Sequence, residues 1–239
     1  MRRKLRSATV VANPKKEWAV RERHKVEKFL RERGIAVSKN GEILITIGGD
    51  GTILYNKTRG VPILGIGTHS SFICQARREN WRAKLGKILE RGYGVEKRAL
   101  LSCELNGRKV QDALNEFALR SHCHRVLEFE LRVGKKNFKF SADGLIFATP
   151  TGSSAYSYSC GGRELPSHAR RYVITPIAPH RRAFSARAVS DRIVSRAVVL
   201  AECEADLIVD GQFVHKLKLN RKNIARIYKS RKHVELVKV

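Results

Sequence analysis

The segment from Ile45 to Leu54, ITIGGDGTIL, restricts the fold more than any other part of the chain. A short apolar run typical of a buried strand ends in three closely spaced glycines, and a second apolar run, typical of a short helix, begins at Thr52. A strand that passes through a glycine turn into a helix is the first part of a βαβ unit. The segment therefore predicts an α/β domain with a mainly parallel sheet.

Strands and helices alternate on both sides of this segment. The first helix has Trp18, Val26 and Leu30 on one stripe with Phe29 beside it, and Gly34 is its expected cap. A later helix has Trp81, Leu85, Ile88 and Leu89 as its apolar positions. The full pattern predicts strands over 7–12, 42–47 and 61–66, and helices within 15–34 and 79–92.

The pattern of predicted secondary structure changes near residue 96. Short β-rich runs separated by Gly, Asn, Asp or Pro continue from there to the end of the chain. This pattern is typical of an antiparallel, sandwich-like β domain. We expect two domains, 1–95 and 96–239, with the final segment free to pack back on the first.

The chain is strongly basic. It carries 48 Lys+Arg against 22 Asp+Glu, a formal charge of +26, which favours a polyanionic partner such as nucleic acid, anionic lipid or nucleotide phosphates. The charge is spread along the chain without an RNA-reading aromatic signature or zinc-finger spacing, so no specific nucleic acid is predicted. No run approaches the roughly 18 apolar residues of a membrane span. The five cysteines include no C-x-x-C pair, and we expect a cytoplasmic protein.

The tripeptide His122, Cys123 and His124 offers metal-binding side chains. On a strand the two histidines would share one face and the cysteine would lie on the other, which is poor geometry for one tetrahedral site. Ordinary polar surface is the favoured interpretation, and no metal ligand set is predicted.

Asp50 stands inside a glycine loop of the kind that cradles phosphate, where a carboxylate would repel the anion. It could accept a hydrogen bond from a sugar hydroxyl, act as general base on that hydroxyl, or lie near a magnesium ion that bridges phosphates. The alternative is a structural turn in which Asp50 caps Thr52 and the amides after it.

A second polar block, ADGLIFATPTGSSAYSYSCGG, covers residues 142–162. A strand-like run enters a loop of Pro, Gly, Thr and Ser, whose hydroxyls could line a polar ligand. An ordinary surface loop is the competing interpretation.

These motifs together resemble the NAD kinase family. In order they are GGDGT (48–52), NE (Asn115, Glu116), DGLIFATPTGSSAYSYSCGG (143–162), ITPIAPH (174–180) and VDGQ (209–212). GGDGT alone is shared with diacylglycerol kinases and sphingosine kinases and, closely, with phosphofructokinases. The TPTGSSAY block between NE and DGQ is far more specific to NAD kinases.

The resemblance implies phosphorylation of the 2′-hydroxyl of the adenosine ribose of NAD to give NADP. ATP or inorganic polyphosphate would be the donor and Mg²⁺, or another divalent cation, the cofactor. It also implies an α/β domain followed by a β-rich domain, and a homodimer or homotetramer. Asp50 matches the catalytic aspartate, and Gly48, Gly49, Gly51 and Thr52 match the loop that shapes the donor-phosphate site. The NAD-binding positions that match are Phe72, Asn115, Glu116, Asp143, Thr151, Ser154, Ala155, Tyr156, Ser159 and Asp210.

The chain departs from the family pattern after the third strand. LGIGTHSSFICQ has Gly67 where the family has asparagine, loses a glycine and is one residue shorter, although Phe72 still matches. A lipid kinase that shares GGDGT and a non-catalytic nucleotide-binding regulator remain as alternatives. Taken singly, Asn115 and Glu116 could form a surface turn, Tyr156 could belong to the core, and VDGQF could be a hairpin turn.

Overall fold

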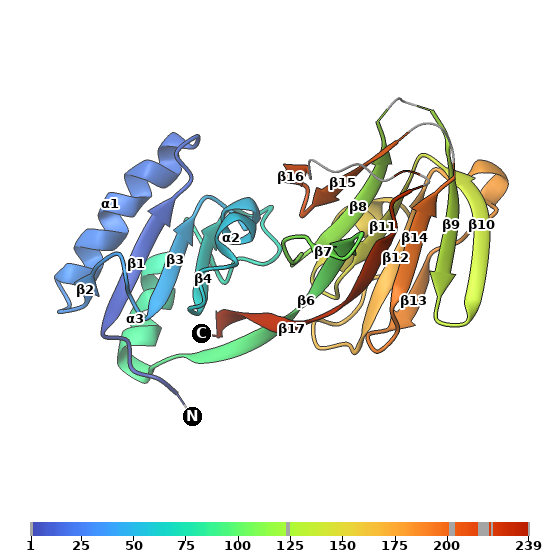
Figure 1. Cartoon of the computed structure of the whole chain (residues 1–239). Helices are drawn as coiled ribbons and strands as arrows, with labels where there is room; N and C mark the ends of the chain where they lie inside the picture. Colours follow the sequence, from blue (N-terminus) through green and yellow to red (C-terminus); the bar gives the residue numbers. More distant parts are fainter. Residues whose placement is uncertain (1, 123–124, 201–203, 215–219, 221, 239) are drawn as a thin grey trace. The chain divides into compact units, whose positions relative to one another are not determined.

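The structure is a computed structural model and describes residues 2–122, 125–200, 204–214, 220 and 222–238 (Figure 1). The chain divides into two compact units, one of residues 1–97 with 234–239 and one of residues 98–233. It leaves the first unit within β6 (Gly94–Leu105) and returns to it within β17 (Ala225–Lys238). None of the helices in the described ranges has the length and apolar character that a membrane crossing requires.

The first unit is built on a parallel sheet with the strand order β2-β1-β3-β4-β5. This arrangement confirms the α/β prediction. Near the end of the chain, Leu236 of β17 pairs in parallel with Ile63 of β4. The elements are β1 (Ser7–Ala12), α1 (Glu17–Arg31), β2 (Ala36–Val37), β3 (Ile43–Ile47), α2 (Asp50–Asn56), β4 (Ile63–Gly67), β5 (Ala76–Arg77) and α3 (Trp81–Arg91).

The core of the first unit joins the sheet to α1 and α3. Every residue of β3 and β4 is buried, as expected for central parallel strands. The Phe29 and Trp81 rings lie 5.5 Å apart, edge to face, and Trp81 Nε1 donates to Glu22 Oε2 over 2.9 Å. The end of α1 follows the expected glycine cap: Gly34 has φ +73°, and the N–H of Ile35 donates to the Leu30 carbonyl.

Several element boundaries differ from the sequence prediction by one or two residues, and two of these differences have a clear cause. Helix α2 begins at Asp50 rather than Thr52, because the backbone of Gly49 (φ 97°, ψ −171°) completes the turn and Gly51 is accommodated in the first helical turn. Strand β4 begins at Ile63 rather than residue 61, because Pro62 has no N–H for a ladder bond and contributes only its carbonyl, to Leu44.

The second unit consists of two antiparallel sheets. One has the order β10-β9-β14-β17, with β6 on β17 and β7 on β6, and the other has the order β13-β12-β11-β8-β15-β16. Short helical turns η1 (Gly152–Ser154), α4 (Tyr156–Ser159) and η2 (His180–Arg182) connect strands. The remaining strands are β7 (Arg108–Lys109), β8 (Glu116–Ser121), β9 (Leu127–Val133), β10 (Lys136–Ala142), β11 (Gly144–Ala148), β12 (Arg171–Ile177), β13 (Arg187–Ser190), β14 (Ser195–Val199), β15 (Ala205–Val209) and β16 (Phe213–Val214).

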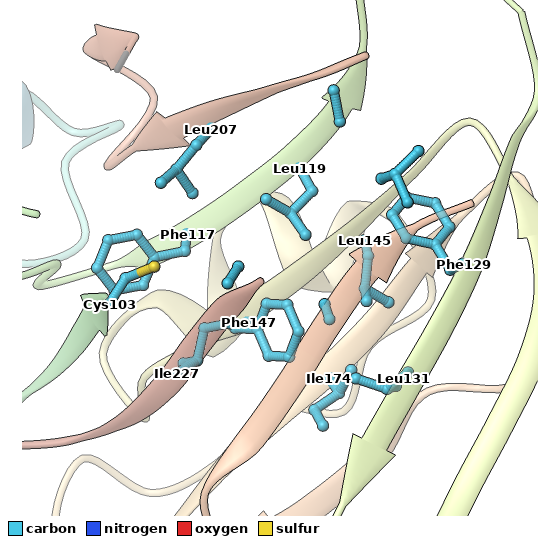
Figure 2. Close-up of a cluster of buried hydrophobic side chains, with 14 of the residues drawn as sticks. Cys103, Phe117, Leu119, Phe129, Leu131, Leu145, Phe147, Ile174, Leu207 and Ile227 are labelled. Atoms are coloured by element: carbon cyan, nitrogen blue, oxygen red, sulfur yellow. The ribbon is translucent and has the colours of Figure 1, made fainter. Parts of the chain in front are cut away.

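Apolar side chains from both sheets meet in one core, which Figure 2 shows. Phe117 and Phe147 come from one sheet and Phe129 and Ile227 from the other, and all four are fully buried. Along β9, Leu127, Phe129 and Leu131 are buried and the residues between them are not, which is the alternation of a strand with one face in a core. The sandwich-like prediction for the C-terminal half is confirmed.

Candidate active site

The first unit gathers three loops at one edge of its sheet. The loops follow β1, β3 and β4, which are neighbouring parallel strands, so their carboxyl ends lie together, where α/β sheets bind ligands. Hydrogen bonds join the loops: the N–H of Asn13 donates to the Ile47 carbonyl over 2.8 Å, and Lys16 Nζ donates to the Gly48 carbonyl over 2.8 Å. Residues from three separate segments thus meet around GGDGT.

Glycine is required where β3 turns toward α2. Gly48 has φ +143° and Gly49 has φ +97°, a conformation that other residues rarely adopt. A Cβ on Gly48 would lie 2.5 Å from Thr52 Oγ1 and 2.6 Å from Asn13 Cβ. The N–H of Gly48 already donates to the Ile66 carbonyl, and that of Thr52 to the Gly49 carbonyl. The N–H groups of Gly48 and Thr52 are therefore already bound within the protein. The glycines shape the loop, and these two N–H groups do not serve as phosphate ligands.

Asp50 is held by the loop that follows β4. Its Oδ2 accepts the N–H of Phe72 over 2.6 Å, and its Oδ1 accepts the N–H of Ile73 over 3.1 Å. The cap position of α2 is Gly49, and the N–H of Thr52 donates to the Gly49 carbonyl instead of to the Asp50 side chain. The structural alternative, in which Asp50 caps Thr52, is therefore wrong: the carboxylate is half-buried and fixed by a segment more than 20 residues away.

The thiol of Cys74 completes the surroundings of Asp50. Cys74 is 7% exposed, and burial, together with the charge and hydrogen bond of Asp50, raises the pKa of its thiol to about 12. A thiol that stays protonated donates rather than repels. The Asp50 carboxylate accordingly faces three hydrogen-bond donors, the N–H groups of Phe72 and Ile73 and the Cys74 thiol.

The backbone and the side chain of Phe72 have different surroundings. Its N–H is bound to Asp50, while the side chain is 79% exposed. An exposed aromatic ring beside a fixed carboxylate is available for stacking on a planar ligand. The structure places Phe72 in the first unit, whereas the other expected NAD-binding residues lie in the second.

In the second unit, Asp210 organises the Asn115–Glu116 segment. Its carboxylate accepts the N–H groups of Leu114 (3.1 Å), Asn115 (2.7 Å) and Glu116 (3.2 Å). Asp210 has φ +52° and Gly211 φ +64°, and Gln212 N–H donates to the Val209 carbonyl, which makes a hairpin turn with two left-handed residues. The hairpin interpretation of VDGQF and its assignment to the site are both compatible with this geometry.

Glu116 is a buried carboxyl beside Asp210. It is 4% exposed, and its Oε2 has no hydrogen-bond partner within the described part of the chain. Burial, followed by the charge of Asp210, raises the pKa of Glu116 to about 8. At neutral pH this carboxyl is largely protonated, so it can donate to a ligand oxygen as well as accept.

The raised pKa of Glu116 predicts an unusual pH dependence of stability. The folded protein keeps this proton up to about pH 8, whereas the unfolded chain loses it near the ordinary value of 4.5. Between these values the folded state binds more protons, so stability falls as the pH rises, by up to roughly 5 kcal/mol in total. Urea unfolding of ligand-free protein at pH 5 to 8 should show this loss, and Glu116→Gln should remove it. The control is Glu128→Gln, which changes an exposed carboxylate. If Glu116→Gln kept the pH dependence of stability seen in the parent, that dependence would belong to another group.

The loop after β11 packs against the Asn115 backbone. Thr149 N–H donates to the Asn115 carbonyl over 2.8 Å, and Thr149 Oγ1 donates to the Leu114 carbonyl. A Cβ on Gly152 would lie 2.1 Å from the Asn115 carbonyl oxygen, so only glycine fits there. Thr151 is 8% exposed, and among the described residues its Oγ1 has no partner. The loop therefore places an unsatisfied hydroxyl in the same unit as Glu116.

The other expected NAD-binding residues lie around this loop to different degrees. Ser154 and Ser159 bond back to their own turns, through the Thr151 and Ala155 carbonyls, and Ser159 is exposed. Tyr156 is half-buried and packs against Ala118, Ile146 and Ala148, so its assignment to the core is partly right. Asp143 is exposed and precedes β11, at the end of the strand opposite to this loop.

The described residues contain no cluster of three or more His, Cys, Asp or Glu side chains that could hold a metal ion. His122 Nδ1 lies 3.1 Å from Asp206 Oδ2, while Cys123 and His124 are outside the described residues. Magnesium that accompanies nucleotides takes most of its ligands from phosphate and water, with one or two protein carboxylates. Asp50 has lone pairs left on both carboxylate oxygens, so it could serve as such a carboxylate ligand.

Sequence reasoning missed several residues of the site. Lys16, Ile73 and Gln75 act on the loop region of the first unit, and Thr149 and Gly152 fix the loop of the second. The position of Lys16 just after β1 was a usable signal, because neighbouring parallel strands end at the same edge. The backbone donors of Phe72 and Ile73 left no signal in the sequence.

Comparison with known proteins gives a consistent result. Residues 114–239 match the family model described as ATP-NAD kinase C-terminal domain. An NAD kinase of Methanosarcina barkeri is 31% identical over 236 residues, 96% of this chain and 82% of that protein. The crystal structure of an NAD kinase from Archaeoglobus fulgidus in complex with ATP superposes with a TM-score of 0.81 at 26% identity, covering 96% of this chain and 92% of the other. A yeast NADH kinase complexed with NADH shares the fold, with a TM-score of 0.86 at 16% identity over 99% and 84% of the two chains.

Proposed function

This chain belongs to the NAD kinase family, and from that premise we propose that it phosphorylates the 2′-hydroxyl of the adenosine ribose of NAD to give NADP. ATP or inorganic polyphosphate is the donor. Asp50 takes the hydroxyl proton, O2′ forms a bond to the terminal phosphorus, and the bond from that phosphorus to the bridging oxygen breaks. The leaving group is ADP or the shortened polyphosphate. The observation that carries the proposal is the half-buried Asp50 carboxylate, held by two backbone amides in a glycine loop.

The roles of the other residues follow from their positions. Gly48, Gly49, Gly51 and Thr52 shape the loop that approaches the donor phosphates. Lys16, whose Nζ lies at the Gly48 carbonyl, brings a positive charge to that loop. A divalent cation, Mg²⁺ by preference, neutralises the donor phosphates when it is bound. In-line positioning and charge neutralisation are the main requirements of this reaction.

The residues assigned to the dinucleotide are those that match the family's NAD-binding positions. Phe72 offers an exposed side chain for stacking on the adenine. Asn115 and Glu116 contact the adenosine half, with Asp210 fixing their backbone. Asp143, Thr151, Ser154, Ala155, Tyr156 and Ser159 hold the rest of the molecule. The buried hydroxyl of Thr151 and the protonated carboxyl of Glu116 supply hydrogen-bond donors for it.

A matrix of acceptors and donors tests the function. Purified protein is incubated with NAD or diacylglycerol, each with ATP or polyphosphate, in the presence of Mg²⁺. NADP should form from NAD with at least one donor, and diacylglycerol should remain unphosphorylated. Phosphorylation of diacylglycerol alone would identify a lipid kinase, and NAD binding without product would identify a non-catalytic regulator.

Removal of the divalent cation should abolish the activity. With excess chelator, NADP formation should fall to background, because the donor phosphates then lose their main source of neutralising charge. Added Mg²⁺ should restore it. Unchanged turnover in chelator would contradict the proposed cation, and the basic residues of the chain alone would then have to hold the donor.

We further propose that the protein works in the cytoplasm as a homodimer or homotetramer. The support is the family resemblance alone. Sedimentation at several salt concentrations is a direct check, because a formal charge of +26 on each chain opposes assembly until it is screened.

A further inference from the structure

Arg77 is the residue behind the loop that holds Asp50. It lies on β5, is half-buried, and turns its guanidinium back toward residues 71–74. Its Nη2 donates to the Ser71 carbonyl over 2.7 Å, and its Nη1 donates to the Cys74 carbonyl over 2.7 Å. The planar fork of arginine suits two carbonyls at once. These two carbonyls bracket the two amides that bind Asp50.

One peptide group connects Arg77 to Asp50 directly. The Ser71 carbonyl and the Phe72 N–H belong to the same trans peptide, in which C=O and N–H point in opposite directions. Arg77 Nη2 binds the oxygen of this peptide at 2.7 Å, and Asp50 Oδ2 binds its hydrogen, with an N···O distance of 2.6 Å. The guanidinium therefore sets the direction of the N–H that holds the carboxylate.

The same arrangement strengthens the hydrogen bond to Asp50. A cation on the carbonyl oxygen polarises the peptide and makes its N–H a better donor, because hydrogen bonds in a chain reinforce each other. The Ile73–Cys74 peptide, two peptide groups further along the chain, is bound by a neutral group instead: Gln75 Nε2 donates to the Ile73 carbonyl over 2.6 Å. Among these contacts, Arg77 alone brings a permanent charge.

We propose that Arg77 is a positioning residue for phosphoryl transfer, which orients the Asp50 carboxylate through the Ser71–Phe72 peptide. The inference rests on the proposed role of Asp50 as the base. It also gives a function to the shortened segment after β4, where the family pattern is lost: its conformation depends on a side chain outside the family motifs. Asp50 touches the substrate, and Arg77 acts only through the loop.

The first test is kinetic. Arg77→Ala should lower kcat roughly 10²-fold, because a displaced base loses its alignment with the hydroxyl. The KM for NAD should change little. The kcat of Arg77→Lys should lie between those of the parent and Arg77→Ala. Added guanidinium ion should restore part of the activity of Arg77→Ala. The matched control is Arg78→Ala, because Arg78 is exposed and its guanidinium lies 5.9 Å from the Trp18 ring instead of on the loop.

The second test does not depend on activity. Hydrogen exchange of the Phe72 and Ile73 amides should be faster in Arg77→Ala than in the parent, with exchange in the β3 core unchanged. Faster exchange throughout the first unit would instead show general destabilisation and overturn a specific positioning role.

A double-variant comparison separates this inference from the proposed function. In the Asp50→Asn background, Arg77→Ala should cost little more, because both changes remove the same contribution. Parent-like kcat in Arg77→Ala, or multiplied losses in the double variant, would overturn the positioning role while leaving Asp50 in place. Parent-like turnover in Asp50→Asn would overturn the base itself, whatever Arg77 does.

Discussion

Asp50→Asn is expected to lower kcat for NAD phosphorylation roughly 10²–10⁴-fold, the usual contribution of a general base, while NAD still binds. Asparagine is nearly isosteric with aspartate but cannot take up the hydroxyl proton. Its amide also has one oxygen for the two donors on Phe72 and Ile73, so one of these N–H groups faces an NH₂ group. The loop should therefore loosen as well, at a cost of roughly 1–3 kcal/mol in stability.

Calorimetric binding of NAD, steady-state kinetics and urea unfolding measure the three effects of Asp50→Asn separately. The control is Glu79→Gln, which removes an exposed carboxylate close to the same loop in the sequence. Asp50→Glu keeps the charge but lengthens the side chain, and it should also lose most turnover. Turnover equal to that of the parent in Asp50→Asn would exclude Asp50 as the base.

Asp210→Ala is expected to destabilise the protein by roughly 3–5 kcal/mol, because three backbone N–H groups lose their acceptor together. They belong to Leu114, Asn115 and Glu116, of which Leu114 and Glu116 are buried. With the segment no longer fixed, NAD binding should weaken strongly. Alanine also disfavours the left-handed conformation that Asp210 adopts at φ +52°.

The urea midpoint and the NAD dissociation constant measure the effect of Asp210→Ala. Asp210→Asn separates the causes, since asparagine tolerates the left-handed turn and keeps one acceptor oxygen. It should be intermediate in both quantities. The control is Asp206→Ala, on β15, the strand that ends one residue before Asp210; the Asp206 carboxylate binds His122 near the surface. Parent-like stability in Asp210→Ala would contradict the role of Asp210 as the organiser of this segment.

Local sequence signals predicted the elements of the fold well. Strand β1 matches residues 7–12 to the residue, because an apolar run before Asn-Pro has a clear end. The cap at Gly34 followed from the conformational freedom of glycine. The two-residue strands β2 and β5 were not predicted, since they are fixed by their partners instead of by any pattern of their own.

The site was predicted in its motifs but not in its contacts. The order of GGDGT, NE, TPTGSSAY and DGQ identified the family and named Asp50, Glu116 and Asp210. The sequence could not reveal that Asp210 binds the backbone of Asn115, because that contact joins positions 95 residues apart through main-chain atoms common to every residue. The hydrogen bonds from the Phe72 N–H to Asp50 and from Arg77 to the Ser71 carbonyl were not predicted for the same reason.

The most direct test of the account follows the position of the transferred phosphate. The parent protein and Asp50→Asn are incubated with NAD, Mg²⁺ and ATP or polyphosphate, and the product is examined by phosphorus NMR. The parent should produce the 2′-phosphomonoester of NADP, and the variant should produce almost none in the same time while still binding NAD. A folded parent protein that binds NAD but forms no 2′-phosphate with either donor would contradict the account.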